Sequence, residues 1–301
     1  MFLHNDLELF REVISATANE MQMTLPIVEK DYYVTMILKI LSDKAPECVF
    51  KGGTSLSKCH HVIDRFSEDI DITFMEKLGR GPRRQFKEHV IKLIGEKLDM
   101  PIPDWDKKWS KSDYNCYIFN YDPLDGYVPA SLFKGVKMEV ALGSQSFPTE
   151  RKMVDSYVYQ FLCKDNIDIV KEFGLEPFEM NVQALDRTFI DKVFAICDYY
   201  LDDDLKLHSR HIYDIYMLLP YMRFGDSFKE LVSAVRVHRQ GMGICKSAGD
   251  EYNISKLLKQ IVNDRVYEKD YAEITDYFQK TKIDYDVAIA ALMQVADSGM
   301  F

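Results

Sequence analysis

The sequence predicts an α+β protein, in which a mixed β-sheet is flanked by helices and followed by a mostly helical C-terminal domain. In the first half of the chain, short runs of alternating apolar and polar residues, typical of strands, are separated by stretches with helical periodicity. From residue 186 onward, apolar residues recur mainly at helical spacing. The chain has 301 residues, 47% of them apolar, which is enough to bury one large core or two smaller ones. We expect two domains, residues 1–165 and 166–301.

Two amphipathic helices are expected before the first strand. The first covers about the first twenty residues, and its apolar stripe contains Leu7, Phe10, Ile14 and Ala18. The second begins near Pro26, and its apolar stripe contains Ile27, Val34, Leu38 and Leu41. Asp31 falls on the second stripe, where a carboxylate needs a partner. Asp31 either pairs with a buried Arg or caps a backbone group, or it supports the wall of a functional site.

A turn with two glycines follows the strand that contains Val49 and Phe50. Its sequence is Lys51-Gly52-Gly53-Thr54-Ser55-Leu56. Glycine permits unusual backbone angles and a close approach of main-chain N–H groups to an anion, and Thr54 or Ser55 suits a helix N-cap. The pattern therefore predicts a phosphate-binding turn, although an ordinary strand-to-helix turn has the same composition.

The next strand is predicted to carry two carboxylates on one face. It follows from the run Arg65-Phe66-Ser67-Glu68-Asp69-Ile70-Asp71-Ile72. Because strand residues alternate between faces, Asp69 and Asp71 project to one side, while the isoleucines enter the core. Two carboxylates in this arrangement can hold Mg²⁺.

A third acidic residue comes from a later pair of strands. Alternating apolar residues predict two adjacent antiparallel strands with turn residues 122–126 between them: Tyr117, Phe119 and Tyr121, then Val136, Met138 and Val140. Lys137 and Glu139 share the opposite face of the second strand. If that strand lies beside the strand of Asp69 and Asp71, Glu139 becomes a third acidic group near the metal. Otherwise, Lys137 and Glu139 face water on a half-solvated sheet.

Regular elements continue through the rest of the chain. A helix is expected from about Pro82 to Leu98, and further strands from about Met153 to Leu162 and from Met180 to Leu185. Later helical segments are predicted at residues 228–237, 254–262 and 287–295, with a loop at 238–253.

Charged residues in the helical half of the chain also need partners. A helix capped by Asp186 places Lys192 at the edge of its apolar stripe, where an ammonium is costly unless an anion meets it. Lys192 therefore reaches solvent, pairs with an acidic neighbour or binds an anionic ligand. In the next helix, Arg210 and Asp214 are one turn apart and can form an ion pair.

This order of motifs resembles the nucleotidyltransferases of the DNA polymerase β superfamily and, more narrowly, the AbiEii/AbiGii toxin family. The match runs from about Ile27 to about Leu219. Besides the glycine turn and the two carboxylates, it includes Glu29-Lys30-Asp31-Tyr32-Tyr33, the strand with Lys137 and Glu139, the helix with Lys192, and Arg210-His211-Ile212-Tyr213-Asp214. One departure is a spacer before Asp69 that is longer than the superfamily's commonest range.

The resemblance implies a polymerase β-like nucleotidyltransferase core and assigns roles to residues of this chain. The catalytic carboxylates are Asp69, Asp71, Glu139 and Asp214, of which the first three are the metal ligands. The nucleotide-binding residues are Lys51, Gly52, Gly53, Thr54, Ser55, Ser67, Lys192 and Arg210. The implied cofactor is Mg²⁺, with Mn²⁺ as the other candidate, and the implied substrate is an NTP.

The resemblance further implies a toxin of an abortive-infection type, with a cognate antitoxin. Such a toxin transfers nucleotide from an NTP to an RNA acceptor, for which the tRNA 3′ end is the implied candidate, and so blocks translation. Two alternatives stay open: the same site modifies a protein or a small molecule, or the chain binds nucleotides without catalysis. The presence of both Asp69 and Asp71 argues against an inactive protein.

Composition limits the partners of the chain. A formal net charge of −10 argues against a surface that binds nucleic acid everywhere. Two basic clusters either contact RNA or form solvated loops: Lys77, Arg80, Arg83, Arg84 and Lys87, and Lys107, Lys108 and Lys111 beside Trp105 and Trp109.

Apolar runs stay below the ~20 residues needed to span a bilayer, and the N-terminal residues lack a signal-peptide pattern, so we expect a cytoplasmic protein without membrane contact. The scattered cysteines are expected to be reduced thiols.

Overall fold

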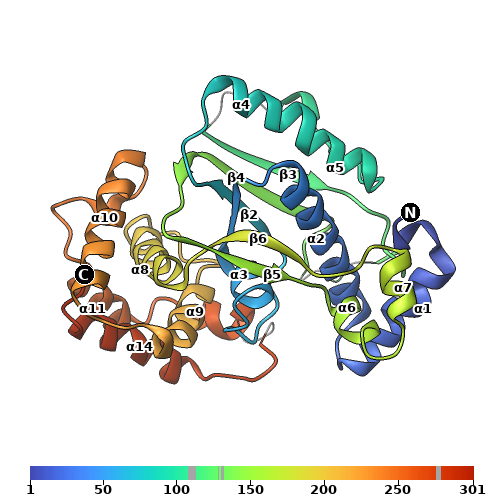
Figure 1. Cartoon of the computed structure of the whole chain (residues 1–301). Helices are drawn as coiled ribbons and strands as arrows, with labels where there is room; N and C mark the ends of the chain where they lie inside the picture. Colours follow the sequence, from blue (N-terminus) through green and yellow to red (C-terminus); the bar gives the residue numbers. More distant parts are fainter. Residues whose placement is uncertain (108–112, 128, 130–131, 276–278) are drawn as a thin grey trace. The chain divides into compact units, whose positions relative to one another are not determined.

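The computed structural model describes residues 1–107, 113–127, 129, 132–275 and 279–301 (Figure 1). These residues form two compact units. The first comprises Met1–Cys59 and Glu68–Val182, and the second comprises His60–Ser67 and Gln183–Phe301. The boundary expected between residues 165 and 166 falls inside the first unit, because the chain beyond it adds a strand to the sheet of that unit.

The first unit is built on a mixed sheet. Its strands are β1 (Cys48–Lys51), β2 (Ile70–Phe74), β3 (Tyr114–Phe119), β4 (Val136–Gln145), β5 (Thr149–Val154) and β6 (Phe178–Gln183). In the described residues the strand order is β3-β4-β2-β1-β6-β5. β2 is antiparallel to β1 and parallel to β4, β3 is antiparallel to β4, and β6 is parallel to β1. Together with the flanking helices, this sheet confirms the predicted α+β fold.

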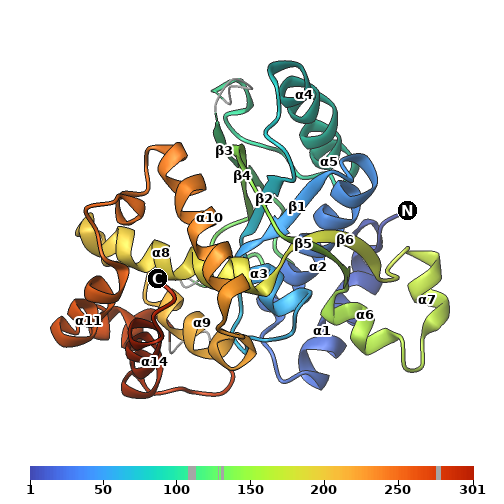
Figure 2. The ribbon, with the colours of Figure 1, turned by 60° about the vertical axis from the view of Figure 1, so that its left-hand side comes forward.

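Helices of the first unit lie around the sheet. They are α1 (Leu7–Glu20), α2 (Leu25–Lys44), α3 (Gly52–Lys58), α4 (Arg80–Gln85), α5 (Lys92–Lys97), α6 (Tyr157–Leu162) and α7 (Ile167–Glu172). A π-helical segment, Phe86–Ile91, joins α4 to α5, so the helix predicted over this region is confirmed. Helix α6 contacts α1, α2 and α7 (Figure 2). Helix α2 contacts α1, α5, α6 and β4, and is buried along most of its length.

One predicted strand is partly wrong. The strand expected from about Met153 to Leu162 ends at Val154, and the rest of the segment forms α6. The reason is a helix cap, since the Ser156 hydroxyl accepts a hydrogen bond from the Tyr159 N–H at 3.0 Å. The strand expected at Met180 to Leu185 is confirmed as β6.

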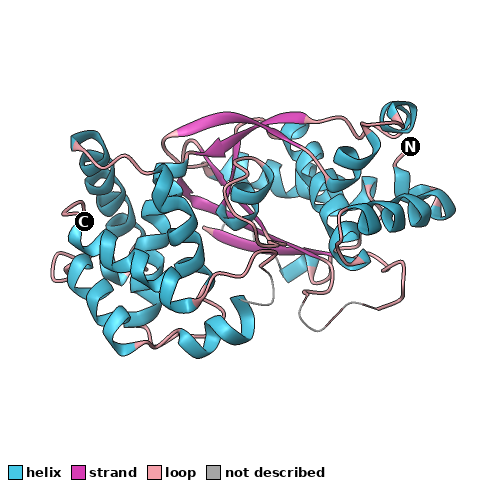
Figure 3. Ribbon diagram, turned by 90° about the horizontal axis from the view of Figure 1, so that it is seen from below, coloured by secondary structure: helices cyan, strands magenta, loops and turns pink. Residues whose placement is uncertain are grey.

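The second unit is mostly helical, as predicted, and Figure 3 shows its helices in cyan. They are α8 (Leu185–Leu201), α9 (Arg210–Leu218), α10 (Asp226–Met242), α11 (Ile254–Asp264), α12 (Glu268–Asp270) and α14 (Tyr285–Asp297). Ala184 is the N-cap of α8, so Asp186 lies in the first turn rather than at the cap. The segment 60–67 packs with these helices, because the Asp64 carbonyl accepts from the Lys280 N–H at 3.0 Å and the Asp64 N–H donates to the Tyr213 hydroxyl at 3.1 Å. No helix among the described residues is both long and apolar enough to cross a membrane.

Candidate functional site

A row of polar side chains crosses one face of the sheet in the first unit. Asp71 of β2 is in register with Lys51 of β1 and with Glu139 of β4, and Glu139 is in register with Cys116 of β3. Residues in register on neighbouring strands project to the same face, whereas Ile70, Ile72, Met138 and Val140 are fully buried on the other. The prediction that the Glu139 strand lies beside the Asp71 strand is therefore confirmed. Asp69 immediately precedes β2 and is partly exposed.

Lys137 connects two of these carboxylates. Its Nζ lies 3.3 Å from Asp69 Oδ2 and 3.0 Å from Glu139 Oε1. Burial by itself lowers the pKa of Lys137, but the charges of Asp69 and Glu139 outweigh burial and raise its pKa above the ordinary value. Asp69 and Glu139 thus reach a common cation. Strand alternation predicted that Lys137 lies on this face, but it did not predict this contact with the carboxylates.

The glycine turn is shaped around Asp71. Gly52 has a φ of +78°, and a Cβ added there would lie 2.0 Å from Asp71 Oδ2. Only glycine therefore allows both this backbone conformation and this approach of the carboxylate. The Lys51-Gly52 turn and the β2 carboxylate form one local structure.

Hydroxyl groups brace the same turn. Thr54 Oγ1 donates to the Asp69 carbonyl oxygen at 2.5 Å, and Ser55 Oγ donates to the Gly52 carbonyl oxygen at 2.8 Å. Both side chains are buried. These bonds fix the backbone on either side of the carboxylates, and a role of Thr54, Ser55 and Gly53 toward phosphate stays a prediction.

Tyr114 is a further residue of this face that sequence analysis missed. Burial, followed by the charge of Glu139, raises the pKa of its phenol, which hydrogen-bonds Glu139 and also lies near Asp71. About half of the Tyr114 side chain is exposed. The only signal in the sequence is its position at the start of β3, three residues before the alternating run used to predict that strand.

The donor chemistry of this face fits a divalent cation. Mg²⁺ and Mn²⁺ prefer oxygen ligands, which Asp69, Asp71 and Glu139 supply. The Gly52 turn leaves room for the Asp71 carboxylate, and Lys137 shows that Asp69 and Glu139 reach one positive charge. Among the described residues no three His, Cys, Asp or Glu side chains converge closely enough to form a ready metal site. A metal ion would therefore have to replace the Lys137 ammonium between the carboxylates.

The second unit contains a buried cluster around Asp214. This carboxylate is fully buried on α9, and it accepts from Arg65 Nε at 2.8 Å, from Arg65 Nη2 at 2.7 Å and from Lys192 Nζ at 2.6 Å. Burial by itself raises the pKa of Asp214, but Arg65 and Lys192 outweigh burial and hold the pKa well below its usual range. Lys192 therefore has an acidic neighbour as its partner.

The ion pair that helical spacing allowed between Arg210 and Asp214 is not formed. Arg210 is not an ion-pair partner of Asp214 in the described part of the chain, because Asp214 faces the interior, where Arg65 and Lys192 meet it. Arg65 is a residue that sequence analysis missed as a partner. The only indication in the sequence was that Arg65 belongs to the run that also contains Ser67 and Asp69. Ser67 itself is half-buried in the segment 60–67.

The predicted basic clusters are only partly surface features. Arg83 is buried, lies 2.7 Å from Asp113 and donates to the Leu78 carbonyl, and the Lys87 ammonium lies 4.6 Å from the centre of the Trp105 ring. The exposed members of the first cluster are Lys77, Arg80 and Arg84. Lys108, Trp109 and Lys111 of the second cluster lie outside the described residues.

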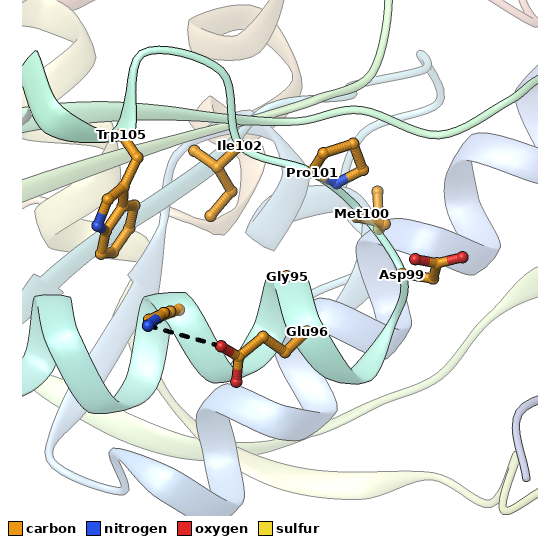
Figure 4. Close-up of a pocket in the computed structure, with 8 residues that line it drawn as sticks. Gly95, Glu96, Asp99, Met100, Pro101, Ile102 and Trp105 are labelled. Carbon is orange, nitrogen blue, oxygen red and sulfur yellow. Dashed lines mark ion pairs between the residues drawn. The ribbon is translucent and has the colours of Figure 1, made fainter.

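A groove of about 310 Å³ in the first unit does not contain the candidate residues. Figure 4 shows it between α5 and the loop that carries Met100, Ile102 and Trp105. Lys92 and Glu96 form an ion pair at 3.8 Å along its edge. The groove and the carboxylate face are therefore separate features of the first unit.

A glycine turn packed against Asp71 of β2, with Asp69 just before that strand and Glu139 on the next strand, is the arrangement expected of a nucleotidyltransferase. The family model "Nucleotidyl transferase AbiEii toxin, Type IV TA system" matches residues 37–291. The chain therefore belongs to the AbiEii family of nucleotidyltransferase toxins, which confirms the resemblance drawn from its motifs. It is a nucleotidyltransferase toxin of a type IV toxin–antitoxin system, for which the family implies an NTP substrate and a cognate antitoxin.

A solved structure shares the fold. The nucleotidyltransferase toxin MenT4 from Mycobacterium tuberculosis H37Rv is 16% identical, with a TM-score of 0.51, and the alignment covers 95% of this chain and 88% of MenT4. No curated protein matches the sequence. At this identity, the likeness to MenT4 supports the fold alone.

Proposed function

We propose that this toxin uses Mg²⁺ to transfer a nucleotide from an NTP to the 3′ end of tRNA, so that the tRNA can no longer be aminoacylated. The observation that carries this proposal is the carboxylate face, where Asp69 and Glu139 reach one cation and Asp71 is in register with Glu139. The acceptor follows from the family resemblance. The exposed cations Lys77, Arg80 and Arg84 are candidates for RNA contacts.

In this proposal Asp69, Asp71 and Glu139 hold the metal. When bound, Mg²⁺ would supply charge neutralisation at the phosphates and would align the attacking hydroxyl with the α-phosphate. Lys137, which lies between Asp69 and Glu139, would have to give up this place to the metal and would then be a candidate to bind a phosphate oxygen. The main-chain N–H groups of the Gly52-Gly53 turn, with Lys51 at its start, bind further phosphate oxygens.

The cluster of the second unit supplies a fixed cation. Arg65 donates two parallel hydrogen bonds to Asp214, and Asp214 in turn holds Lys192. Arg65 and Lys192 share the single negative charge of Asp214, which favours an anionic ligand near them. We propose that this ligand is the triphosphate, with Ser67 and Arg210 as further contacts.

The test is to incubate the protein with each α-labelled NTP, Mg²⁺ and total cellular RNA, and then to separate labelled RNA from labelled protein. Label in the tRNA fraction, lost in Asp71→Asn and kept in Glu179→Gln, is the expected result. Glu179 is a matched control, because it is an exposed carboxylate on β6 of the same sheet. Label in protein alone would favour the alternative of protein nucleotidylation, and no label with any NTP would overturn the proposal.

A further inference from the structure

Helix α2 carries three consecutive buried charges. Glu29 is 1% exposed, Lys30 1% and Asp31 4%. A buried charge is costly unless it is paired and hydrogen-bonded, so all three need partners. Successive helix residues project about 100° apart, so these partners come from three different parts of the first unit.

Lys30 holds the residue that precedes Asp69. Its Nζ lies 2.5 Å from Glu68 Oε2 and also donates to the Phe133 carbonyl oxygen. Glu68 accepts in addition from the Phe133 N–H at 3.1 Å. Burial lowers the pKa of Lys30 and the charge of Glu68 opposes this, as expected for an ion pair shielded from water.

Asp69 is thus restrained from two directions. On one side, Lys30 fixes Glu68, and on the other the Thr54 hydroxyl holds the Asp69 carbonyl oxygen at 2.5 Å. Free rotation of the backbone at residues 68 and 69 would move the Asp69 carboxylate away from Glu139. The Lys30–Glu68 pair acts on the backbone before Asp69 from outside the glycine turn, whereas Lys137 contacts the Asp69 carboxylate itself.

Asp31, the next residue on α2, holds the helix that follows the glycine turn. Asp31 Oδ1 lies 2.5 Å from Nζ of Lys58, the last residue of α3, and Asp31 Oδ2 accepts from the Tyr157 N–H at 2.8 Å. Helix α3 begins at Gly52, against which Asp71 packs. Of the roles that the sequence left open for Asp31, the structure therefore shows the structural one. Its partner is a Lys, where the sequence suggested a buried Arg.

We propose that Lys30 is a positioning residue for the metal centre, which acts through Glu68 to fix Asp69 in its place beside Glu139. This inference rests on the proposed function, because it takes Asp69 as a metal ligand. Lys30 belongs to the Glu29-Lys30-Asp31 motif of the family resemblance, although the match to the AbiEii family model begins only at residue 37. We assign Lys30 no direct contact with substrate or metal, because its side chain is 1% exposed and is bound to Glu68 and Phe133.

A purely stabilising role makes a different prediction. Lys39 is a matched control on the same helix, because its Nζ donates to the Gly174 carbonyl oxygen and lies 3.9 Å from Glu176 Oε2. Replacing Lys30 with Met removes one ammonium, one carbonyl hydrogen bond and one carboxylate contact. Replacing Lys39 removes the same groups and a second carbonyl hydrogen bond, to the Glu176 carbonyl oxygen at 3.2 Å. If the lysines only stabilise the fold, both replacements lower the melting temperature and neither changes metal affinity.

The test measures binding of Mn²⁺ alone, by electron paramagnetic resonance of the free ion, together with thermal unfolding. We expect Lys30→Met to weaken Mn²⁺ binding by about tenfold or more, as for the loss of a group that orients a metal ligand. Lys39→Met should bind Mn²⁺ like the wild type. Glu68→Gln and the double variant Lys30→Met/Glu68→Gln should weaken binding to about the same extent as Lys30→Met, because both residues belong to one interaction.

Two outcomes overturn the inference and can be told apart. Folded Lys30→Met with wild-type Mn²⁺ affinity, or losses that add in the double variant, would overturn the positioning role while leaving the metal centre in place. Equal Mn²⁺ binding by wild type and Asp71→Asn would overturn the metal centre itself, and the positioning role with it. If Lys30→Met does not fold, the Mn²⁺ affinity of Glu68→Gln tests the positioning role by itself. This variant is expected to fold, because Glu68 is partly exposed and its replacement keeps the side-chain volume.

Discussion

Replacing Gly52 with alanine tests the contact between the glycine turn and Asp71. The new Cβ would lie 2.0 Å from Asp71 Oδ2, whereas real Cβ contacts essentially never fall below 3.0 Å, so the two atoms must separate by about 1 Å. The left-handed φ of +78° adds strain of about 1–2 kcal/mol for any residue with a Cβ. A displacement of about 1 Å at a catalytic group can lower the rate by about a hundredfold.

The control for this variant is Gly243→Ala. Gly243 has a similar φ of +71°, and a Cβ there would have no atom within 4 Å. It therefore carries the same backbone strain without a clash. Gly243→Ala should lose about 1–2 kcal/mol of unfolding free energy in urea denaturation and Gly52→Ala at least as much, but only Gly52→Ala should lose nucleotide transfer and Mn²⁺ affinity.

The reasoning is refuted if Gly52→Ala folds and keeps wild-type transfer and Mn²⁺ affinity. In that case Asp71 would not need its present position for function. Loss of transfer in both alanine variants would instead show that activity follows stability, and the Gly52–Asp71 contact would have no special role.

Three further predictions concern single side chains. Asp71→Asn should abolish transfer with little change in melting temperature, because it removes a charge at almost constant volume; near-normal turnover would contradict its role as a metal ligand. Lys192→Ala should weaken NTP binding more than RNA binding, and the opposite result in filter binding with both ligands would reassign Lys192 to the acceptor. Burial raises the pKa of Glu29 from 4.5 to about 7, so the folded state binds this proton more tightly than the unfolded state, and the contribution of Glu29 to stability falls as the pH rises through that window. Glu29→Gln should remove this pH-dependent loss of stability. Near pH 8 its unfolding free energy should exceed that of the wild type by at most about 3 kcal/mol, and near pH 4.5 the difference should be much smaller. A difference that does not change with pH would contradict the assignment.

The elements near the glycine turn were predictable because their patterns are local. Strand alternation placed Asp71 and Glu139 on single faces, and the structure brings their strands together in register. The cation shared by Asp69 and Glu139 was not predictable, because it depends on the side-chain conformation of Lys137 across two strands. Alternation also failed where a cap at Ser156 starts a helix inside an apolar run.

The cluster in the second unit shows a different limit. Helical spacing reports neighbours one turn apart, and it offered Arg210 as the partner of Asp214. The partners found are Lys192, which is 22 residues away, and Arg65, which is 149 residues away. A contact over such a separation is set by the packing of the whole unit, which periodicity does not describe.

The burial of Asp214 changes how its assigned role can be tested. A carboxylate with no exposed surface, whose oxygens are bound by Arg65 and Lys192, acts on a ligand only through those two cations. Asp214→Asn would leave two buried cations without their counter-charge, and breaking a buried pair in this way costs about 3–5 kcal/mol. Growth of cells that express this variant would therefore report loss of the fold as readily as loss of catalysis. The decisive comparison for toxicity is wild type against Asp71→Asn at matched levels, because Asp71 is partly exposed, whereas Asp214 is fully buried between two cations.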